Sequence, residues 1–456
     1  MGFSVSAVFM VLAVAVVLAF NIFAGALMPT LSHFNVSIHE TKERGLQNVQ
    51  SRLNITNVTD GETGFWWDTS FGFRKKIDIT GSKAAGTKYP IKLIIASSPR
   101  ITDSYDFTLE GLAYDFPNDI RFYDQDNNNE LDYWIENTSA DPISVWVEVG
   151  ADLETDQSVY VYYGSPDASS SSNGEDTFNI FFDDFETDLS KWETNEQCSS
   201  AHVELNDTRS TEGNSSVYIY TDSAGCRAQL NLTVDITIDV AIEFDWAPKA
   251  SFVDYQTFWT LTAEGGFSIG NLYAAEDVTP FNFCYYNGAA LVPLTATYTV
   301  DMEWHHIQEF YDLFNDVYDI YIDDILQKTD ANFVNPVANI GFITFQSGAG
   351  GDEGHQFLDT FRIRKWVDPE PAFASADPQE TILLTVEIEN TGSISLSTSD
   401  FFILVNGTKY NARANISSIY PLNEEKVYTT TQTPYGMKRV KIIAATNVED
   451  YYQQTE

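Results

Sequence analysis

The sequence predicts a mainly β protein, with one N-terminal transmembrane helix followed by three β-sandwich domains. Residues 3–31 carry no charged side chain. From residue 65 onward, short runs alternate apolar with polar residues and are separated by turn residues, a pattern typical of β-strands. With 456 residues the chain is too long for one ordinary domain, so several packed cores are expected.

The composition limits the partners of the protein. Lys and Arg number 25 against 66 Asp and Glu, which gives a formal net charge of −41. Such a surface repels nucleic acid and anionic lipid headgroups, so we expect no nucleic-acid partner. It suits a protein that is solvated at high salt or surrounded by divalent cations, although acidity also serves simply to keep a domain soluble. Aromatic residues make up 14% of the chain, which favours strands over helices.

The segment 1–31 is predicted to be a transmembrane anchor that inserts in the lipid bilayer. Its apolar core, residues 5–28, is long enough to cross a bilayer as a helix. A cleavable secretory signal is the alternative. Such signals usually begin with a basic region, and no Lys or Arg precedes this apolar run, so a retained anchor is favoured.

The orientation follows from the long acidic domain and from nine Asn-X-Ser/Thr sequons beyond the anchor. We expect a single-pass protein of the cell membrane whose large C-terminal part lies in the extracellular or pseudoperiplasmic space. The candidate glycosylation sites are Asn35, Asn54, Asn57, Asn137, Asn206, Asn214, Asn231, Asn406 and Asn415.

The part of the chain that follows the anchor divides into five segments. Residues 32–64 have apolar residues at spacings that allow a helical stalk, followed by a linker. Alternating runs such as YPIKLIIA and SVYVYYG predict a β-sandwich over 65–165. A Ser-rich linker is expected at 166–177. Runs such as ITIDVAIEFDW and VYDIYIDDIL predict a second β domain over 178–368, and the last, 369–456, has the size and strand pattern of an immunoglobulin-like sandwich.

The three cysteines are Cys198, Cys226 and Cys284. Their spacing fits no zinc site. A disulfide between Cys198 and Cys226 is the candidate in an oxidising compartment, and it would leave Cys284 unpaired.

Metal and catalytic chemistry find little support in the sequence, and we expect neither a cofactor nor enzyme activity. The paired acids Asp183, Asp184, Asp323 and Asp324 are weak candidates for a structural calcium site, and hairpin or edge positions are the favoured alternative. His305 and His306 are adjacent on a predicted strand, so their side chains point to opposite faces and do not easily ligate one ion.

A glycoside hydrolase would need two carboxylates that face one cleft. The relevant hydrolase family carries its acids on one strand in the pattern E-x-D-x-x-E. Glu243 and Asp245 are two residues apart and share a face of their strand, but no third acid follows them to complete this pattern. Hydrolysis is therefore only a remote alternative.

Three resemblances to known families add to these expectations. The N-terminal run MGFSVSAVFMVLAVAVVLAF and the terminal segments VEIENTGSISLSTSDFFILVNGT and KRVKIIAATN resemble the archaellum accessory proteins FlaF and FlaG. That resemblance implies a β-sandwich outside the membrane that belongs to the stationary part of the motor and contacts the S-layer. In this chain, two further predicted sandwiches stand between the N-terminal helix and the terminal sandwich.

The second resemblance covers about 65–165, where the series DIRFYD, LDYWIE, SVWVEVG and SVYVYYG looks like a family of unknown function in prokaryotic surface proteins. The third covers about 178–366, where FDDFETDLSKW, WHHIQEFYD and FLDTFRIRKW are similar to laminin-G and concanavalin-like jelly rolls. Many members of that group bind glycans or proteins.

Together these observations predict a non-enzymatic, membrane-anchored structural and interaction protein of the archaeal envelope. Its expected partners are an envelope or S-layer protein, or archaellum components, to which it would act as a stator-like accessory. The alternative is a cell-surface adhesin that binds glycan through the concanavalin-like domain. A homo-oligomer is a further option that the sequence leaves open.

Overall fold

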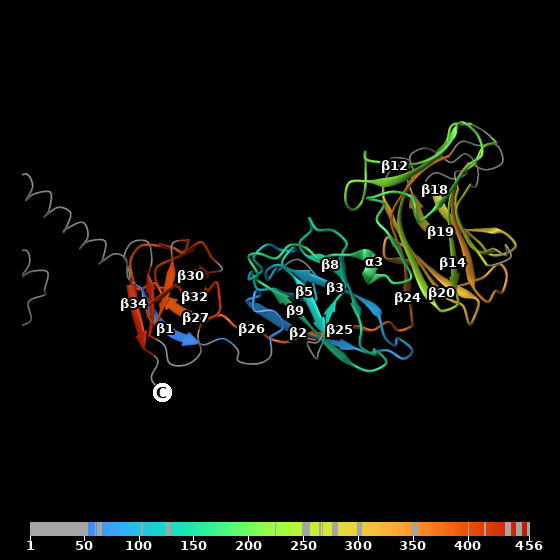
Figure 1. Cartoon of the computed structure of the whole chain (residues 1–456). Helices are drawn as coiled ribbons and strands as arrows, with labels where there is room; N and C mark the ends of the chain where they lie inside the picture. The colour runs from blue at the N-terminus through green and yellow to red at the C-terminus, as the bar shows by residue number, and fades with distance from the viewer. Residues whose placement is uncertain are drawn as a thin grey trace, which may run out of the picture. The chain divides into compact units, whose positions relative to one another are not determined.

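The computed structural model shows a mainly β protein, as the sequence predicts (Figure 1). The residues it describes are 53–59, 61, 66–101, 104–124, 129–223, 225–248, 256–263, 266, 268–275, 281–298, 303–348, 354–399, 401–414, 416–433, 439–443 and 449–453. The expected membrane helix at 1–31 and most of the stalk lie outside these ranges. In the ranges above, no helix is both long enough and apolar enough to span a bilayer.

The chain divides into two compact units, and one is inserted into the other. The first unit, here the terminal unit, joins residues 1–63 to residues 381–456, and the second comprises residues 64–380. Strand β1 (Asn54–Thr59) lies before the insertion but pairs with β27 (Thr385–Glu389) after it. Residues 54–59, expected in the stalk and linker, therefore form a strand of the terminal unit.

The terminal unit is built around one continuous antiparallel sheet with the order β1-β27-β32-β30-β29-β33-β34. Alternate residues of these strands, among them Ile55, Val386, Ile403 and Ile442, form its apolar core. A short pair, β28-β31, accompanies the sheet. Its other strands are β28 (Leu396–Ser397), β29 (Phe402–Val405), β30 (Thr408–Ala414), β31 (Ser418–Ile419), β32 (Glu424–Thr429), β33 (Arg439–Ile443) and β34 (Glu449–Gln453).

The second unit begins with a sandwich of two sheets, which we call the first sandwich. One sheet has the order β25-β2-β9-β5-β6 with β26 beside β2, and the other has the order β4-β3-β8-β7. Its strands are β2 (Phe73–Thr80), β3 (Tyr89–Ala96), β4 (Phe107–Thr108), β5 (Arg121–Asp124), β6 (Glu130–Leu131), β7 (Tyr133–Ile135), β8 (Ile143–Val149), β9 (Gln157–Tyr163), β25 (Ala372–Ala376) and β26 (Glu380–Thr381).

Two segments expected outside this domain belong to it. Strand β25, assigned from the sequence to the terminal domain, pairs with β2, so the chain returns to the first sandwich after residue 366. The expected linker at 166–177 is packed: Ser172 Oγ accepts a hydrogen bond from the Ile135 amide, and the segment ends in the short helix α3 (Gly174–Thr177). The Ser-rich composition of this segment predicted a free linker, because composition alone does not reveal these hydrogen bonds.

Along the chain, the second sandwich lies between β9, after which the chain leaves the first sandwich, and β25, where it returns to it. One sheet has the order β12-β13-β24-β15-β20-β21-β22 with β10 beside β24, and the other has the order β11-β14-β23-β16-β17-β18-β19. Inward side chains from both sheets, such as Phe244, Trp259, Phe345 and Phe361, form one core. This confirms the predicted two-sheet sandwich.

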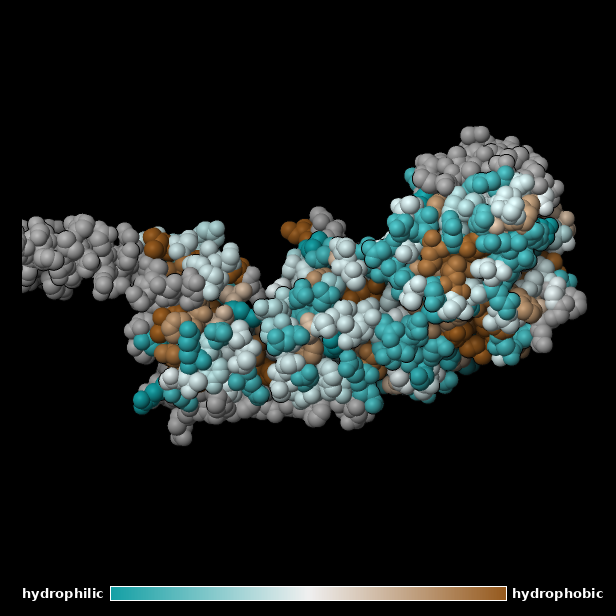
Figure 2. Space-filling model, turned by 45° about the horizontal axis from the view of Figure 1, so that its top comes forward, coloured by the Kyte–Doolittle hydropathy of each residue, from teal (hydrophilic) through white to brown (hydrophobic). Residues whose placement is uncertain are grey.

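The strands of its first sheet are β10 (Phe181–Asp183), β12 (Ala201–Asn206), β13 (Ser216–Thr221), β15 (Val240–Pro248), β20 (His305–Asp312), β21 (Val317–Ile322), β22 (Ile325–Asn332) and β24 (Gly354–Lys365). Those of the second sheet are β11 (Glu193–Glu196), β14 (Ala228–Ile236), β16 (Gln256–Thr262), β17 (Ser268–Ala275), β18 (Phe281–Tyr286), β19 (Leu291–Tyr298) and β23 (Ile340–Ser347). On the face seen in Figure 2, hydrophilic and neutral residues cover most of the described surface, as the net charge leads one to expect.

Candidate functional site

Most charged side chains of the candidate site lie on the outer face of strands β15, β20 and β24. In β15, Ile242, Phe244 and Trp246 point into the core, so Glu243 and Asp245 point away from it, as the alternation predicted. The strand register places Glu243 opposite Arg362, and Asp245 opposite Asp359 and His306. His305 faces the core side and His306 the outer side, again as predicted.

A buried group of ion pairs, here called the ionic joint, connects this face to the first sandwich. Glu243 accepts a hydrogen bond from Arg362 Nη2 at 2.5 Å and from Arg364 Nε at 2.6 Å. Arg362 Nη2 also lies 2.9 Å from Glu136 Oε1, and Arg364 Nη1 lies 2.7 Å from Glu370 Oε2. Because Glu136 follows strand β7, the joint bonds the two sandwiches directly to each other.

The ionic joint is enclosed by aromatic rings. The Arg362 guanidinium carbon lies 5.0 Å from the centroid of the Trp146 ring and 5.6 Å from that of Trp134. Trp134, Trp146, Phe178 and Phe182 form a small buried cluster beside it. Glu243 is 0% exposed and Arg362 is 1% exposed, so these charges are held without bulk water.

The ionisation of the joint is fixed by these contacts. Burial alone would raise the pKa of Glu136, but the nearby charges of Arg362 and Lys92 outweigh it and lower the pKa to about 2. Burial also opposes ionisation of Glu243, and the two guanidinium groups hold its pKa well below the usual range. Both carboxylates are therefore charged at neutral pH, and neither can serve as a general acid.

Beside the joint, the two sandwiches enclose a polar cleft of about 330 Å³. Side chains of both sandwiches line it, and most of them are charged or hydroxylated. They are Lys92, Trp134, Glu136, Asn137, Ser144, Thr211, Glu212, Asp245, His306, Asp324, Thr360 and Arg362.

A His–Asp pair forms part of the cleft wall. His306 Nδ1 lies 2.7 Å from Asp245 Oδ1, and the Thr211 hydroxyl donates to Asp245 Oδ2 at 2.6 Å. Burial lowers the pKa of His306, but its hydrogen bonds to Asp245 and Glu243 outweigh this and raise the pKa to about 9. The imidazole is thus an imidazolium at neutral pH, which makes it a counter-charge and not a general base.

Of the predicted calcium ligands, Asp324 lines the cleft, whereas Asp183 and Asp323 bond to protein groups outside it. Asp183 on β10 accepts hydrogen bonds from Trp192 Nε1 at 2.8 Å and from the Phe185 amide at 3.1 Å. Asp323 and Asp324 form the two-residue turn between β21 and β22 with φ values of 54° and 61°, which is the hairpin position that the sequence favoured. In the described part of the chain, no three His, Cys, Asp or Glu side chains gather as a metal site.

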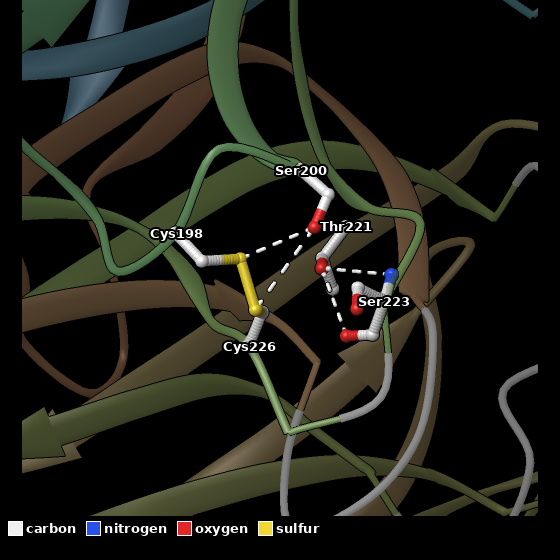
Figure 3. Close-up of a disulfide and its surroundings, with 5 residues drawn as sticks. All are labelled: Cys198, Ser200, Thr221, Ser223 and Cys226. Atoms are coloured by element: carbon white, nitrogen blue, oxygen red, sulfur yellow. Dashed lines mark hydrogen bonds between the residues drawn. A yellow bond between two sulfur atoms is a disulfide. The ribbon is translucent and has the colours of Figure 1, made fainter.

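The candidate disulfide is formed. Cys198 and Cys226 are bonded, with the Ser200 hydroxyl 3.2 Å from Cys198 Sγ (Figure 3). The bridge extends the pairing of β11 with β14, whose last partners are Glu196 and Ala228. Cys284 is buried and free. Such a bond is typical of proteins outside the cytoplasm.

Removing this bridge is expected to destabilise the protein. Replacing both Cys198 and Cys226 with serine should cost about 2–4 kcal/mol, because the closed loop restricts the unfolded chain. Urea unfolding with and without dithiothreitol measures the effect. Reductant should weaken the wild-type protein and leave the double variant unchanged, and a wild-type protein indifferent to reductant would contradict the expectation.

The structure also separates the candidate glycosylation sites by exposure. Asn54, Asn57, Asn137, Asn214 and Asn406 are exposed, whereas Asn206 and Asn231 are partly buried. The Asn231 side chain donates to the Glu193 carbonyl and accepts from the Thr344 hydroxyl. Asn35 and Asn415 lie outside the described residues.

One family model matches part of the chain and supports the predicted resemblance to a family of unknown function. Residues 116–195 match a domain of unknown function, DUF2341, and this match runs past the predicted domain end at residue 165 into the second sandwich. The curated proteins contain no match. None of these comparisons concerns the predicted FlaF and FlaG resemblance, which stays a prediction.

Several solved structures are similar to parts of the chain. A sialidase is 13% identical over 57% of this chain with a TM-score of 0.35, and the match spans 23% of the sialidase. The cellulose induced protein Cip1 is 17% identical over 41% of this chain and 97% of its own, with a TM-score of 0.33. The carbohydrate recognition domain of Emp47p is 15% identical over 41% of this chain and 94% of its own, with a TM-score of 0.28.

Proposed function

We propose that this protein is a non-catalytic structural and interaction protein, held at the membrane by its N-terminal segment and displaying its sandwiches outside the cytoplasm. The observation that carries the proposal is the ionic joint. It binds the first sandwich to the second through charges withdrawn from water, so the pair behaves as one rigid body. Rigid, nested domains suit a protein that spaces or supports other envelope components.

The nesting of the chain supports the same role. The second sandwich leaves from the first and returns to it through β25, and the whole second unit leaves from the terminal unit and returns to it through β27. Each inserted domain is therefore connected to its host domain by two chain segments, one at each of its ends. The terminal unit follows the N-terminal segment directly in the chain. An archaellum stator or an S-layer contact is the specific form of this role that the sequence resemblance suggests.

Native-state hydrogen exchange on the detergent-solubilised full chain tests the rigidity. We expect the amides of β8 in the first sandwich and of β15 in the second to open with the same free energy and the same denaturant dependence, because the joint makes one cooperative unit. Two separate opening energies would count against a rigid pair. Recovery of the native protein from the cytosol would refute the membrane-held location.

A second candidate function is that of an adhesin that binds a small polar ligand. The polar cleft between the sandwiches favours it, because both walls offer hydrogen-bonding groups around a volume of about 330 Å³ and ligand sites are commonly placed between domains.

A further inference from the structure

The cations that line the polar cleft are already matched to acids. Lys92 Nζ lies 3.0 Å from Glu136 Oε2. Arg362 is shared between Glu136 and Glu243, and His306 is paired with Asp245. The cleft therefore has no positive charge left over for an anionic ligand.

Two acids of the same cleft are not matched. Among the described residues, no ion pair or side-chain hydrogen bond is formed by the carboxylate of Glu212 or by that of Asp324, which is exposed at the β21–β22 turn. Glu212 is half-buried, and its neighbours are Asp184 and Glu186. Burial and these like charges raise the pKa of Glu212 to about 7. The pKa is raised because no neighbouring cation offsets them.

The other lining groups are neutral and polar. The Ser144 hydroxyl and the side chain of Asn137 line the cleft, and Thr360 and Trp134, at 4% and 3% exposed, contribute little surface. A ligand with hydrogen-bonding groups and a positive charge therefore matches this lining.

We propose that the polar cleft binds a hydroxylated primary amine, of the chemical class of an amino sugar, whose ammonium group pairs with Glu212 and Asp324. The ammonium supplies the missing counter-charge through charge-assisted hydrogen bonds. The ligand hydroxyls bond to Ser144 and Asn137. This inference rests on the second candidate function and names its ligand class.

Calorimetric titration of the unglycosylated full chain at pH 6.5 tests the proposal, since the Asn137 sequon lies in the cleft. The probes are D-glucosamine, N-acetylglucosamine, glucose and calcium chloride. Glucosamine should bind, and N-acetylglucosamine and glucose should bind at least tenfold more weakly because they lack the ammonium group.

Matched variants assign the binding to the cleft. Glu212→Gln and Asp324→Asn should each weaken glucosamine binding at least tenfold, whereas Glu204→Gln, which removes the same charge from exposed β12, should leave it unchanged. Equal binding of N-acetylglucosamine, an unaffected Glu212→Gln variant, binding of calcium alone, or no binding at all would each overturn the proposal. None of these outcomes alters the hydrogen-exchange test of the rigid pair, so the two proposals fail separately.

Discussion

Replacing Glu243 with alanine is expected to lower the free energy of unfolding by about 3–5 kcal/mol, because it leaves two buried guanidinium groups without their shared partner. Arg362 and Arg364 are 1% and 3% exposed, and both bond to the Glu243 carboxylate. Neither can reach water without parting the aromatic rings around the joint. Urea unfolding at pH 7, followed by tryptophan fluorescence, measures the loss.

The control for this prediction is Glu204→Ala, which removes an acid from the exposed edge of β12 and should change stability by less than about 0.5 kcal/mol. A further variant separates the unpaired charges from the lost side-chain packing. Adding Arg362→Met and Arg364→Met to Glu243→Ala should recover much of the stability, since well-packed apolar groups often replace buried ion pairs at little cost. A loss below about 1 kcal/mol in Glu243→Ala would show that water reaches the joint.

Breaking the joint should also uncouple the two sandwiches. In the Glu243→Ala variant, the amides of β8 and β15 should exchange with different opening free energies, because Glu136 no longer shares Arg362 with a fully buried partner. Stability and coupling would then fall together, which links the energetics of five side chains to the rigidity that the proposed function requires.

Local patterns predicted those parts of the structure that depend on local sequence. The alternation in IEFDW placed Glu243 and Asp245 on one face, and the Asp323–Asp324 pair was favoured as a hairpin turn. Both expectations depend only on strand periodicity and turn chemistry, which residues close in the chain determine.

The features that were missed depend on residues far apart in the chain. Glu136 and Arg362 are 226 positions apart, so no pattern could bring them together. The run FLDTFRIRK did offer a signal, because two arginines on one face of an otherwise buried strand require acidic partners. Strand β1 was missed because NITNVT is polar and its partner β27 follows a long insertion.

The core of the second sandwich contains a carboxyl group that strand alternation did not single out. Glu309 on β20 is 1% exposed, and its Oε2 accepts hydrogen bonds from Trp259 Nε1 at 2.6 Å and Tyr311 Oη at 2.5 Å. Its Oε1 is buried without a hydrogen-bond partner among the described residues. Burial raises the pKa of Glu309 to about 7, because the apolar core disfavours the charged form and supplies no cation.

Glu309→Gln is therefore expected to change how stability depends on pH. The folded-state pKa lies above the unfolded value of 4.5, so the folded protein holds a proton that the unfolded chain releases, and wild-type stability falls as the pH rises from about 4.5 to about 7. A shift of that size corresponds to about 3 kcal/mol. Since glutamine cannot ionise, the variant should gain about 3 kcal/mol relative to wild type between pH 4.5 and pH 8.

Urea unfolding of wild type and Glu309→Gln at several pH values between 4.5 and 8 measures this difference. Comparing the two proteins at each pH cancels the titration of the many surface acids, which both proteins share. Glu204→Gln, which removes an exposed carboxyl from β12, is the matched control for the loss of an acid. A constant difference for Glu309→Gln would mean that water or a cation reaches the carboxylate in the core. Since Glu309 shares β20 with His306, that result would also place solvent next to the strand that supports the polar cleft.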